Sequence, residues 1–123
     1  DNVSELTART NDDGWENVFS KWLETSNLSK NDMLLFFSVG GGSLERKISV
    51  NLINAAKYGK KKKSKIASVI GRKQGYLKKV SNACCVVPTV NKYSITPHTE
   101  TYQVFVWHML VSHPKLQIKK TVW

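Results

Sequence analysis

Apolar residues recur with two different periods along the chain, and these periods separate helical from extended segments. Over residues 15–23 they return every three or four positions, as on one face of an amphipathic helix, with Asp13 as the candidate N-cap. Residues 33–39 are instead apolar almost without interruption, which is typical of a strand covered on both faces in a parallel sheet. A shorter helix fits residues 3–10, and the polar stretch 11–14 is typical of a turn.

The same alternation continues toward the end of the chain. The predicted elements there are a helix at 44–56 that ends near Gly59, a strand at 66–70, a helix at 75–82, a strand at 84–90 and a helix at 98–113. Pro88 cannot donate to a strand ladder, so it is expected near an end or an edge. Helices that alternate with buried strands predict right-handed βαβ units. The expected fold class is therefore α/β, a three-layer sandwich of a mainly parallel sheet with helices on both faces, in a single domain over 1–123.

The composition is that of a folded domain, with 41% hydrophobic and 23% charged residues. No uninterrupted apolar run reaches the roughly 18 residues that a membrane span needs, so no membrane partner is expected. Cys84 and Cys85 are adjacent, and neighbouring residues of a strand point to opposite faces, so the two cannot easily bridge each other. They are predicted to be buried free thiols, which suits a reducing cytoplasm.

The formal net charge is +10, and much of it comes from four consecutive lysines at 60–63 and further cations up to Lys79. Such a cluster has two interpretations, a surface for nucleic acid or a solvated turn with lysine-rich helix faces. The run follows Gly59 between a predicted helix and a predicted strand, and no aromatic residue interleaves with it for base stacking. The solvated interpretation is favoured, and nucleic acid is not an expected partner.

A glycine-rich segment, Ser38-Val39-Gly40-Gly41-Gly42-Ser43, follows the first buried strand. Ligands of open parallel sheets bind at this position, beyond the carboxyl ends of the strands. Glycines let the backbone approach a ligand closely, and the free amides of a helix that starts at Ser43 would favour an anion. Ser38 and Ser43 add hydroxyl groups, and Ser43 is also a candidate cap. The segment lacks the Gly-Lys-Ser/Thr ending of a nucleotide P-loop, and a purely structural turn is the alternative to a phosphate site.

Two segments resemble the SIS (sugar isomerase) family. Residues 34–43 are similar to its phosphate loop, Ser-x-Ser-Gly-x-Ser after an apolar strand, and residues 11–19 are similar to the Asn-Asp-x-Gly-Tyr-Glu-x-Val-Phe segment of its sedoheptulose-7-phosphate isomerases. Residues 65–71 and 84–88 match later strands of the family in position and character. The resemblance implies a phosphorylated sugar as ligand, aldose–ketose isomerisation, and a homo-oligomer, dimer or tetramer, with sites between subunits.

The resemblance also assigns residues. It implies that phosphate is held by the glycine-rich segment, at Ser38, Gly40, Gly41, Gly42 and Ser43. It further implies that Asn11 and Asp12 contact the sugar. A non-catalytic module that senses sugar phosphates is the alternative, favoured by Gly40 where the family has serine.

The chain departs from the family pattern in two places. The family begins with two helices, a strand, a Gly-Asn-Gly-Gly-Ser loop and a helix with a zinc-binding His and a catalytic Glu, and none of these precedes Asp1. The expectation is a domain that lacks its first strand and helices. In its last helix the family places Gln and His eight residues apart, whereas this spacing leads from Gln103 to Val111, which can neither ligate nor transfer protons.

The same spacing counted back from His108 leads to Glu100 on the same face of the helix, so this pair is the candidate for catalytic base and acid, or for metal ligands. If zinc is a cofactor, His108 is the candidate ligand, with Gln103 in the other alignment, and Gln103 is also a candidate contact of the substrate. His108 lies between Trp107 and Met109, so a histidine in a core or a subunit interface is the competing interpretation.

Overall fold

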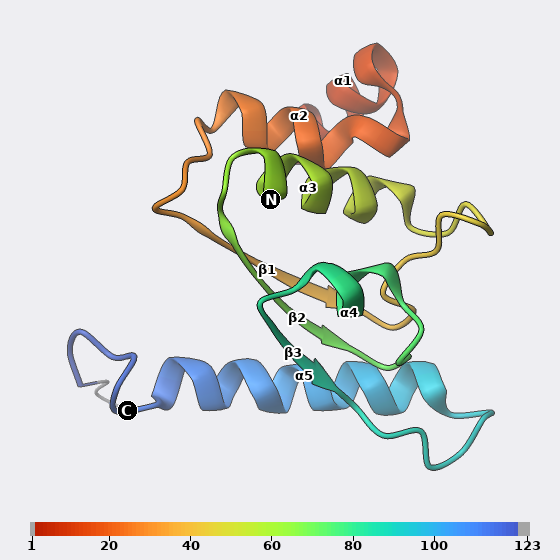
Figure 1. Cartoon of the computed structure of the whole chain (residues 1–123), viewed down its shortest axis with the longest axis vertical. Coiled ribbons are helices and arrows are strands. Elements are labelled where there is room, and N and C mark those ends of the chain that lie inside the picture. Colours follow the sequence, from red (N-terminus) through yellow and green to blue (C-terminus); the bar gives the residue numbers. More distant parts are fainter. Residues whose placement is uncertain (1, 121–123) are drawn as a thin grey trace.

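The computed structural model describes residues 2–120, and its centre is a sheet of three parallel strands in the order β1-β2-β3 (Figure 1). β1 (Met33–Ser38) pairs with β2 (Lys65–Ile70), and β3 (Ala83–Val86) pairs with the other side of β2. Parallel neighbours need crossover connections, which α3 (Val50–Lys61) and α4 (Tyr76–Val80) supply. The three strand ends therefore meet at one edge of the sheet.

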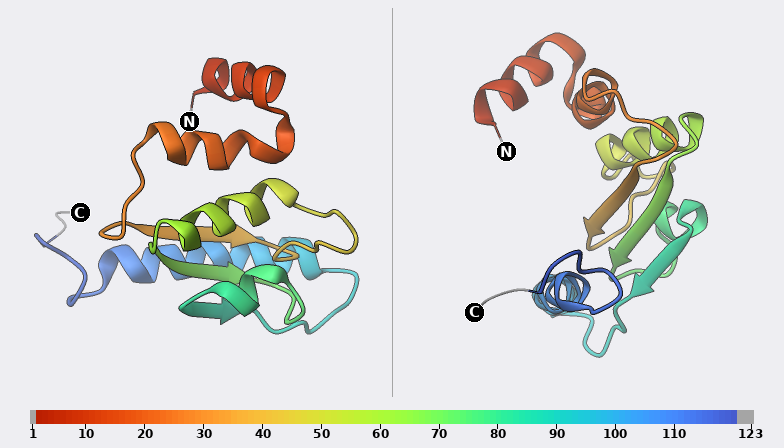
Figure 2. Two further views of the ribbon diagram at one scale, coloured as in Figure 1. Left: turned by 45° about the horizontal axis from the view of Figure 1, so that its top comes forward. Right: turned by 90° about the vertical axis from the view of Figure 1, so that its left-hand side faces the viewer.

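Helices cover both faces, which confirms the predicted α/β sandwich. α3 and α4 lie on one face and α5 (Ile95–Ser112) on the other, as both views in Figure 2 show. The opposite face of β1 is uncovered in the described chain, where Met33 is 62% exposed. The prediction that both faces of this first strand are buried was therefore wrong, because α5 packs on β2 instead.

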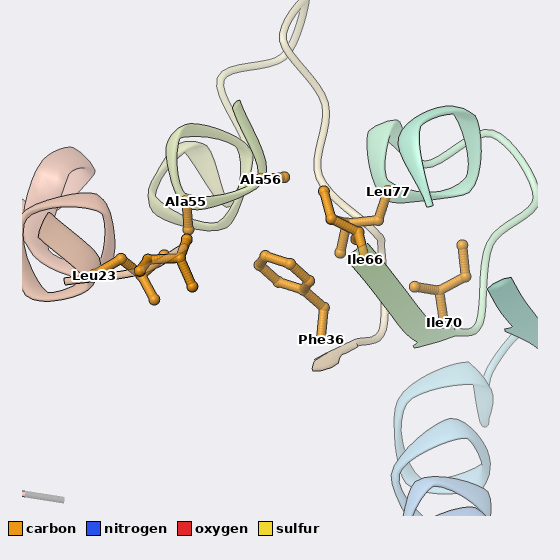
Figure 3. Packing of buried hydrophobic residues seen from close by; sticks show 8 residues of the cluster. Leu23, Phe36, Ala55, Ala56, Ile66, Ile70 and Leu77 are labelled. Carbon is orange, nitrogen blue, oxygen red and sulfur yellow. The ribbon is translucent and has the colours of Figure 1, made fainter. Parts of the chain in front are cut away.

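The core lies between the sheet and the α3/α4 layer (Figure 3). Its buried members come from β1, β2, α3 and α4, from α2 (Val18–Thr25) and from the segment after α2: Leu23, Leu28, Phe36, Ala55, Ala56, Ile66, Ile70 and Leu77. Gly59 is inside α3 rather than at its end, because the helix passes close to β1 there. A Cβ at Gly59 would lie 2.6 Å from Leu34 Cδ1.

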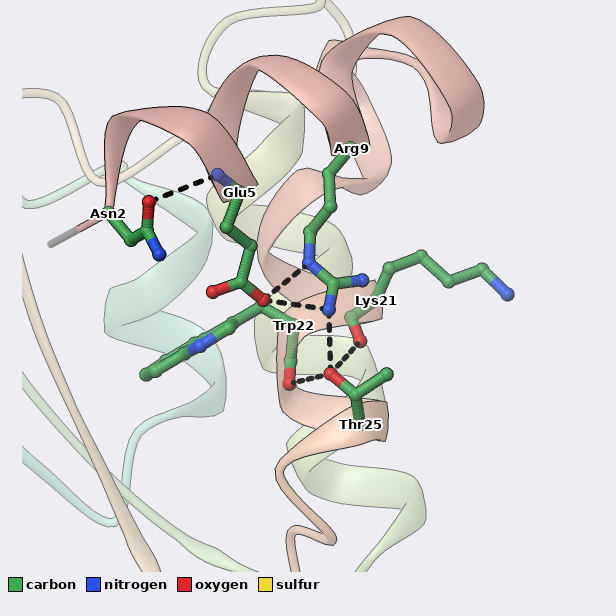
Figure 4. Close-up of polar contacts among 6 residues, drawn as sticks. All are labelled: Asn2, Glu5, Arg9, Lys21, Trp22 and Thr25. Atoms are coloured by element: carbon green, nitrogen blue, oxygen red, sulfur yellow. Dashed lines mark hydrogen bonds and ion pairs between the residues drawn. The ribbon is translucent and has the colours of Figure 1, made fainter.

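The amino-terminal helices pack outside α3. α1 (Val3–Asp13) is followed by a 3₁₀ turn, η1 (Trp15–Asn17), and then by α2. The Arg9 guanidinium joins α1 to α2, because it donates to Glu5 Oε1 at 2.8 and 2.9 Å and to Thr25 Oγ1 at 2.7 Å (Figure 4).

Several predicted boundaries were wrong for local reasons. Residues 11–13 belong to α1 rather than to a turn, and the helix stops at Gly14, whose φ is +80°. The N-cap of α2 is accordingly Asn17, not Asp13. α5 begins at Ile95 and accommodates Pro97 in its first turn, where the missing amide has no helical partner.

The third strand is shorter than predicted and ends at Val86, before Pro88. Both cysteines are free, but Cys84 is only half-buried and Cys85 is exposed, because the edge strand β3 is covered incompletely. The lysines at 60–63 end α3 and form the exposed turn to β2, as the sequence predicted. Within residues 2–120, no helix combines the length and apolarity that crossing a bilayer requires.

Candidate functional site

The glycine-rich loop lies at the carboxyl edge of the sheet, where the sequence placed it, and backbone bonds fix it there. The Gly71 amide donates to the Val39 carbonyl at 2.9 Å. The first amides of α4 reach back to the same loop, from Tyr76 to the Gly42 carbonyl at 2.8 Å and from Leu77 to the Gly41 carbonyl at 2.9 Å. The loop after β1 and the loop after β2 therefore form one connected backbone layer.

The helix after the glycines starts later than predicted. α3 begins at Val50, with Ser49 in the left-handed region as its N-cap, so residues 44–49 are not helical. They form a turn closed by a two-bond bridge, in which Ser43 and Ile48 exchange amide–carbonyl bonds of 3.0 Å each. The prediction that Ser43 caps the helix was wrong, because its Oγ accepts the Arg46 amide within this turn at 3.2 Å.

The turn nevertheless returns the chain to the glycines. A Cβ on Gly42 would lie 2.9 Å from Cγ1 of Ile53, a residue in the first turn of α3. The amino-terminal end of α3, which carries the positive end of the helix dipole, therefore still lies beside the loop.

The backbone amides of the loop differ in whether they have a hydrogen-bond partner. The Gly41 amide donates to Ser38 Oγ at 3.0 Å, and the Ser43 amide is used in the bridge. In the described part of the chain, the amides of Gly40 and Gly42 have no hydrogen-bond partner. Gly41 and Gly42 are buried while Gly40 is half-exposed. Gly40 therefore leaves its backbone open to solvent, and the two glycines behind it shape the turn with φ values of +70° and +78°.

Asn11 and Asp12 lie exposed at the end of α1, where the Asn11 amide donates to Asp12 Oδ1 at 2.9 Å. No hydrogen bond or ion pair within residues 2–120 joins their side chains to the glycine-rich loop. Asn54, one turn into α3, connects the two regions by donating to the Glu16 carbonyl at 3.0 Å and to Asn17 Oδ1 at 3.2 Å. Sequence reasoning missed this role of Asn54, because no local pattern marks a contact across 38 positions.

The residues of α5 point to different sides. Gln103 is half-buried against the sheet, where its Nε2 donates to the Val69 carbonyl at 3.2 Å. Glu100 and His108 are exposed, and the His108 ring stacks on Trp107 at 3.8 Å between centroids. Gln103 and His108 are separated by about 140° around the helix axis, so the structure does not bring them together. Their roles, and that of Glu100, stay predictions.

Thr99 fixes the start of α5 against the sheet. It is only 2% exposed, and a Cβ on Gly71 would collide with its Oγ1. Gly71 at the end of β2 thus allows the close approach of the helix. His108 follows Thr99 by nine residues, or about 14 Å along the helix, so within one chain it lies well away from the carboxyl edge.

The residues of a single chain do not fit a zinc site. Across residues 2–120, no three His, Cys, Asp or Glu side chains cluster closely enough to hold a metal ion. The amide group of Gln103 is also engaged with the sheet. Zinc binding therefore stays a prediction from the resemblance to the SIS family.

Comparisons with known proteins find phosphoheptose isomerases among the relatives, although no family model matches the chain. The phosphoheptose isomerase of Helicobacter pylori is 32% identical over 108 residues, which cover 88% of this chain and 50% of that protein. The lincomycin biosynthesis protein LmbN of Streptomyces lincolnensis is 32% identical over 118 residues, which cover 92% of this chain and 41% of that protein.

Solved structures give the same result for the fold. Phosphoheptose isomerase GmhA from Neisseria gonorrhoeae superposes with a TM-score of 0.68 at 25% identity, over 88% of this chain and 56% of that one. The enzyme from Francisella tularensis gives 0.69 at 22% identity, over 88% and 55%. The chain spans about half the length of the curated relatives it matches. In sequence and in fold, the chain is similar to phosphoheptose isomerases, in agreement with its resemblance to the SIS family.

Proposed function

We propose that the chain is the phosphosugar-binding part of an isomerase that interconverts ketose and aldose phosphates of the phosphoheptose type. The sequence match to phosphoheptose isomerases over 88% of the chain carries this proposal. The geometry supports it, because the aligned region includes a glycine-rich loop fixed at the carboxyl edge with unbonded amides at Gly40 and Gly42. Phosphoheptose isomerases are among the matched relatives, so the non-catalytic alternative is not favoured.

Isomerisation moves a proton between adjacent carbons and needs a base and an acid close to both. We assign these roles to Glu100 and His108, and the phosphate to the loop from Ser38 to Ser43. Since His108 is exposed and far along α5 from the carboxyl edge, it can serve a site only if a second copy of the chain supplies that site. We therefore propose a homo-oligomer that acts in the cytoplasm.

The exposed side of α5 supports such an association. Its large apolar residues are unusually open to solvent: Val104 49%, Phe105 59%, Met109 50% and Val111 49%. A helix that is apolar all round is normally covered by other protein. A second copy would remove this surface from water.

The test is incubation of the full-length isomerase that contains the chain with sedoheptulose 7-phosphate, with the aldose product followed by NMR. We expect turnover that falls by about 100-fold or more in Glu100→Gln and in His108→Gln, because proton transfer by a positioned group contributes about 100- to 10,000-fold. Thr101→Ala, an exposed change on the same helix, is the matched control and should keep the activity. Binding without turnover would support the sensing module instead, and absence of binding would refute both.

A further inference from the structure

Asn51 is a polar side chain that is almost completely buried at the start of α3, and one half of its amide group has no partner in the described chain. The residue is only 7% exposed. Its Oδ1 accepts the Leu52 amide at 2.8 Å, whereas no acceptor for its Nδ2 is found within residues 2–120. Buried polar groups are normally satisfied by protein, by ordered solvent or by a ligand, so this donor indicates a group that binds from outside the chain.

The side chain of Asn51 lies at the amino-terminal end of α3. Backbone amides of a helix point toward its amino terminus, so the bond from the Leu52 amide holds the Asn51 side chain at that end. In the described part of the chain, no fully buried side-chain nitrogen or oxygen lacks a partner. Since Nδ2 lacks one, it must reach solvent. Asn51 therefore presents an oriented N–H donor at an opening beside the first turn of the helix.

The residues next to Asn51 offer further unused donors. The backbone amides of Val50 and Asn51 have no acceptor among residues 2–120. Ser49, the N-cap, is half-buried, and its hydroxyl makes neither a capping bond nor another hydrogen bond to the described residues. α3 is 12 residues long, and the positive end of its dipole lies at the same place. A cluster of donors at the positive end of a helix selects an oxyanion.

This first turn of α3 lies against the glycine-rich loop. A Cβ on Gly42 would lie 3.7 Å from the Ile48 carbonyl oxygen. The Ser49 nitrogen belongs to the same peptide unit, so it lies within roughly 6 Å of that Cβ position. The unused amides of Gly40 and Gly42 and the donors of the first turn therefore lie together, although the bridged turn of residues 43–48 separates them in the sequence.

We propose that Ser49 and Asn51 are ligands of the substrate phosphate, which sits between the glycine-rich loop and the first turn of α3. The Ser49 hydroxyl and the Asn51 side-chain amide each donate to a phosphate oxygen. Ser43, by contrast, uses its amide, its carbonyl and its hydroxyl oxygen within the turn. The ligand class is a sugar with a single phosphate group, so the inference rests on the proposed function and adds two residues to its site.

The test is isothermal titration calorimetry of the full-length isomerase that contains the chain, first with inorganic phosphate and then with sedoheptulose 7-phosphate. Asn51→Asp keeps an oxygen that accepts the Leu52 amide but replaces the donor by a carboxylate. Ser49→Gly removes the hydroxyl and suits the left-handed φ of +51°. Each change should raise the dissociation constant of both ligands about tenfold or more, because a hydrogen bond to a charged group is lost.

Neither variant should weaken the fold, which separates a ligand role from a structural one. The helix dipole favours an aspartate in the first turn, and a glycine is tolerated at a cap that makes no side-chain bond. The midpoint of urea unfolding should therefore match or exceed that of the parent in both variants. Asn27→Gly is the matched control. Asn27 is exposed after α2 and has a φ of +55°, so this change should leave phosphate affinity within about twofold.

Each outcome decides one point. Unchanged phosphate affinity in Ser49→Gly or in Asn51→Asp would overturn the role of that residue. Absence of phosphate binding in the parent, or an equal loss in Asn27→Gly, would overturn the whole inference. Weaker binding in both variants without turnover of sedoheptulose 7-phosphate by the parent would support the two ligands and contradict the isomerase function. Turnover with an unchanged KM in both variants would support the isomerase function and contradict the two ligands.

Discussion

Gly42 and Gly40 lie two positions apart in the same loop, yet substitution by alanine should destabilise the fold at Gly42 and leave its stability nearly unchanged at Gly40. At Gly42 the φ of +78° is unfavourable for any residue with a Cβ, at a cost of about 1–2 kcal/mol. The new Cβ would also lie 2.9 Å from Cγ1 and 3.2 Å from Cδ1 of Ile53, which is completely buried and has no room to move. Overpacking of this kind costs about 1–3 kcal/mol, so Gly42→Ala should lower the free energy of unfolding by about 2–5 kcal/mol.

Gly40 is the matched control. It is not among the residues with positive φ, and a Cβ there would meet no atom within 4 Å. Gly40→Ala should therefore stay within about 0.5 kcal/mol of the parent stability while it places a methyl group at the mouth of the loop, where it weakens phosphosugar binding. Urea unfolding followed by tryptophan fluorescence measures both stabilities. The reasoning fails if Gly42→Ala is as stable as the parent, or if Gly40→Ala loses a comparable amount.

Two further predictions concern the amino-terminal helices. Arg9→Ala removes the hydrogen bonds to Glu5 and Thr25 and should lower the free energy of unfolding by about 1 kcal/mol. Backbone amides should exchange faster with solvent in α1 alone. Equally faster exchange in every helix would argue against a local role. The Lys21 ammonium donates to Glu24 at 3.0 Å and holds the pKa of that carboxyl below its ordinary value, so Lys21→Met should raise this pKa in an NMR titration. Because the carboxyl pKa is lower in the folded than in the unfolded protein, the ionised Glu24 stabilises the fold at pH values above its unfolded pKa, and this stabilisation is lost as the pH falls through its folded pKa. The parent and Lys21→Met should therefore converge in stability in acid. A parallel pH dependence of the two stabilities would contradict the assignment.

The strands and their parallel arrangement were predictable because the hydrophobic pattern that marks each strand is local. Continuous apolar runs such as 66–70 mark buried strands, and helical segments between them leave few alternatives to a parallel sheet. The start of α3 was not predictable in this way. Ile48 fits the helical spacing of the residues after it, but its amide is bonded to the Ser43 carbonyl, and Lys47 and Ser49 adopt φ values of +51°. A bridge across five positions overrides the local period there.

The site shows the same division. Its position followed from the glycines and the preceding strand, and the structure places the loop where expected. The directions of Gln103 and His108 depend on which side of α5 meets the sheet, and the small residue Gly71 opposite Thr99 decides that.

The role of the glycine-rich loop can be tested most directly by a crystal structure of the chain with sedoheptulose 7-phosphate. We predict phosphate oxygens within hydrogen-bond distance, about 2.7–3.2 Å, of amides in the segment from Gly40 to Ser43. A phosphate bound elsewhere, with those amides facing only protein, would contradict the account.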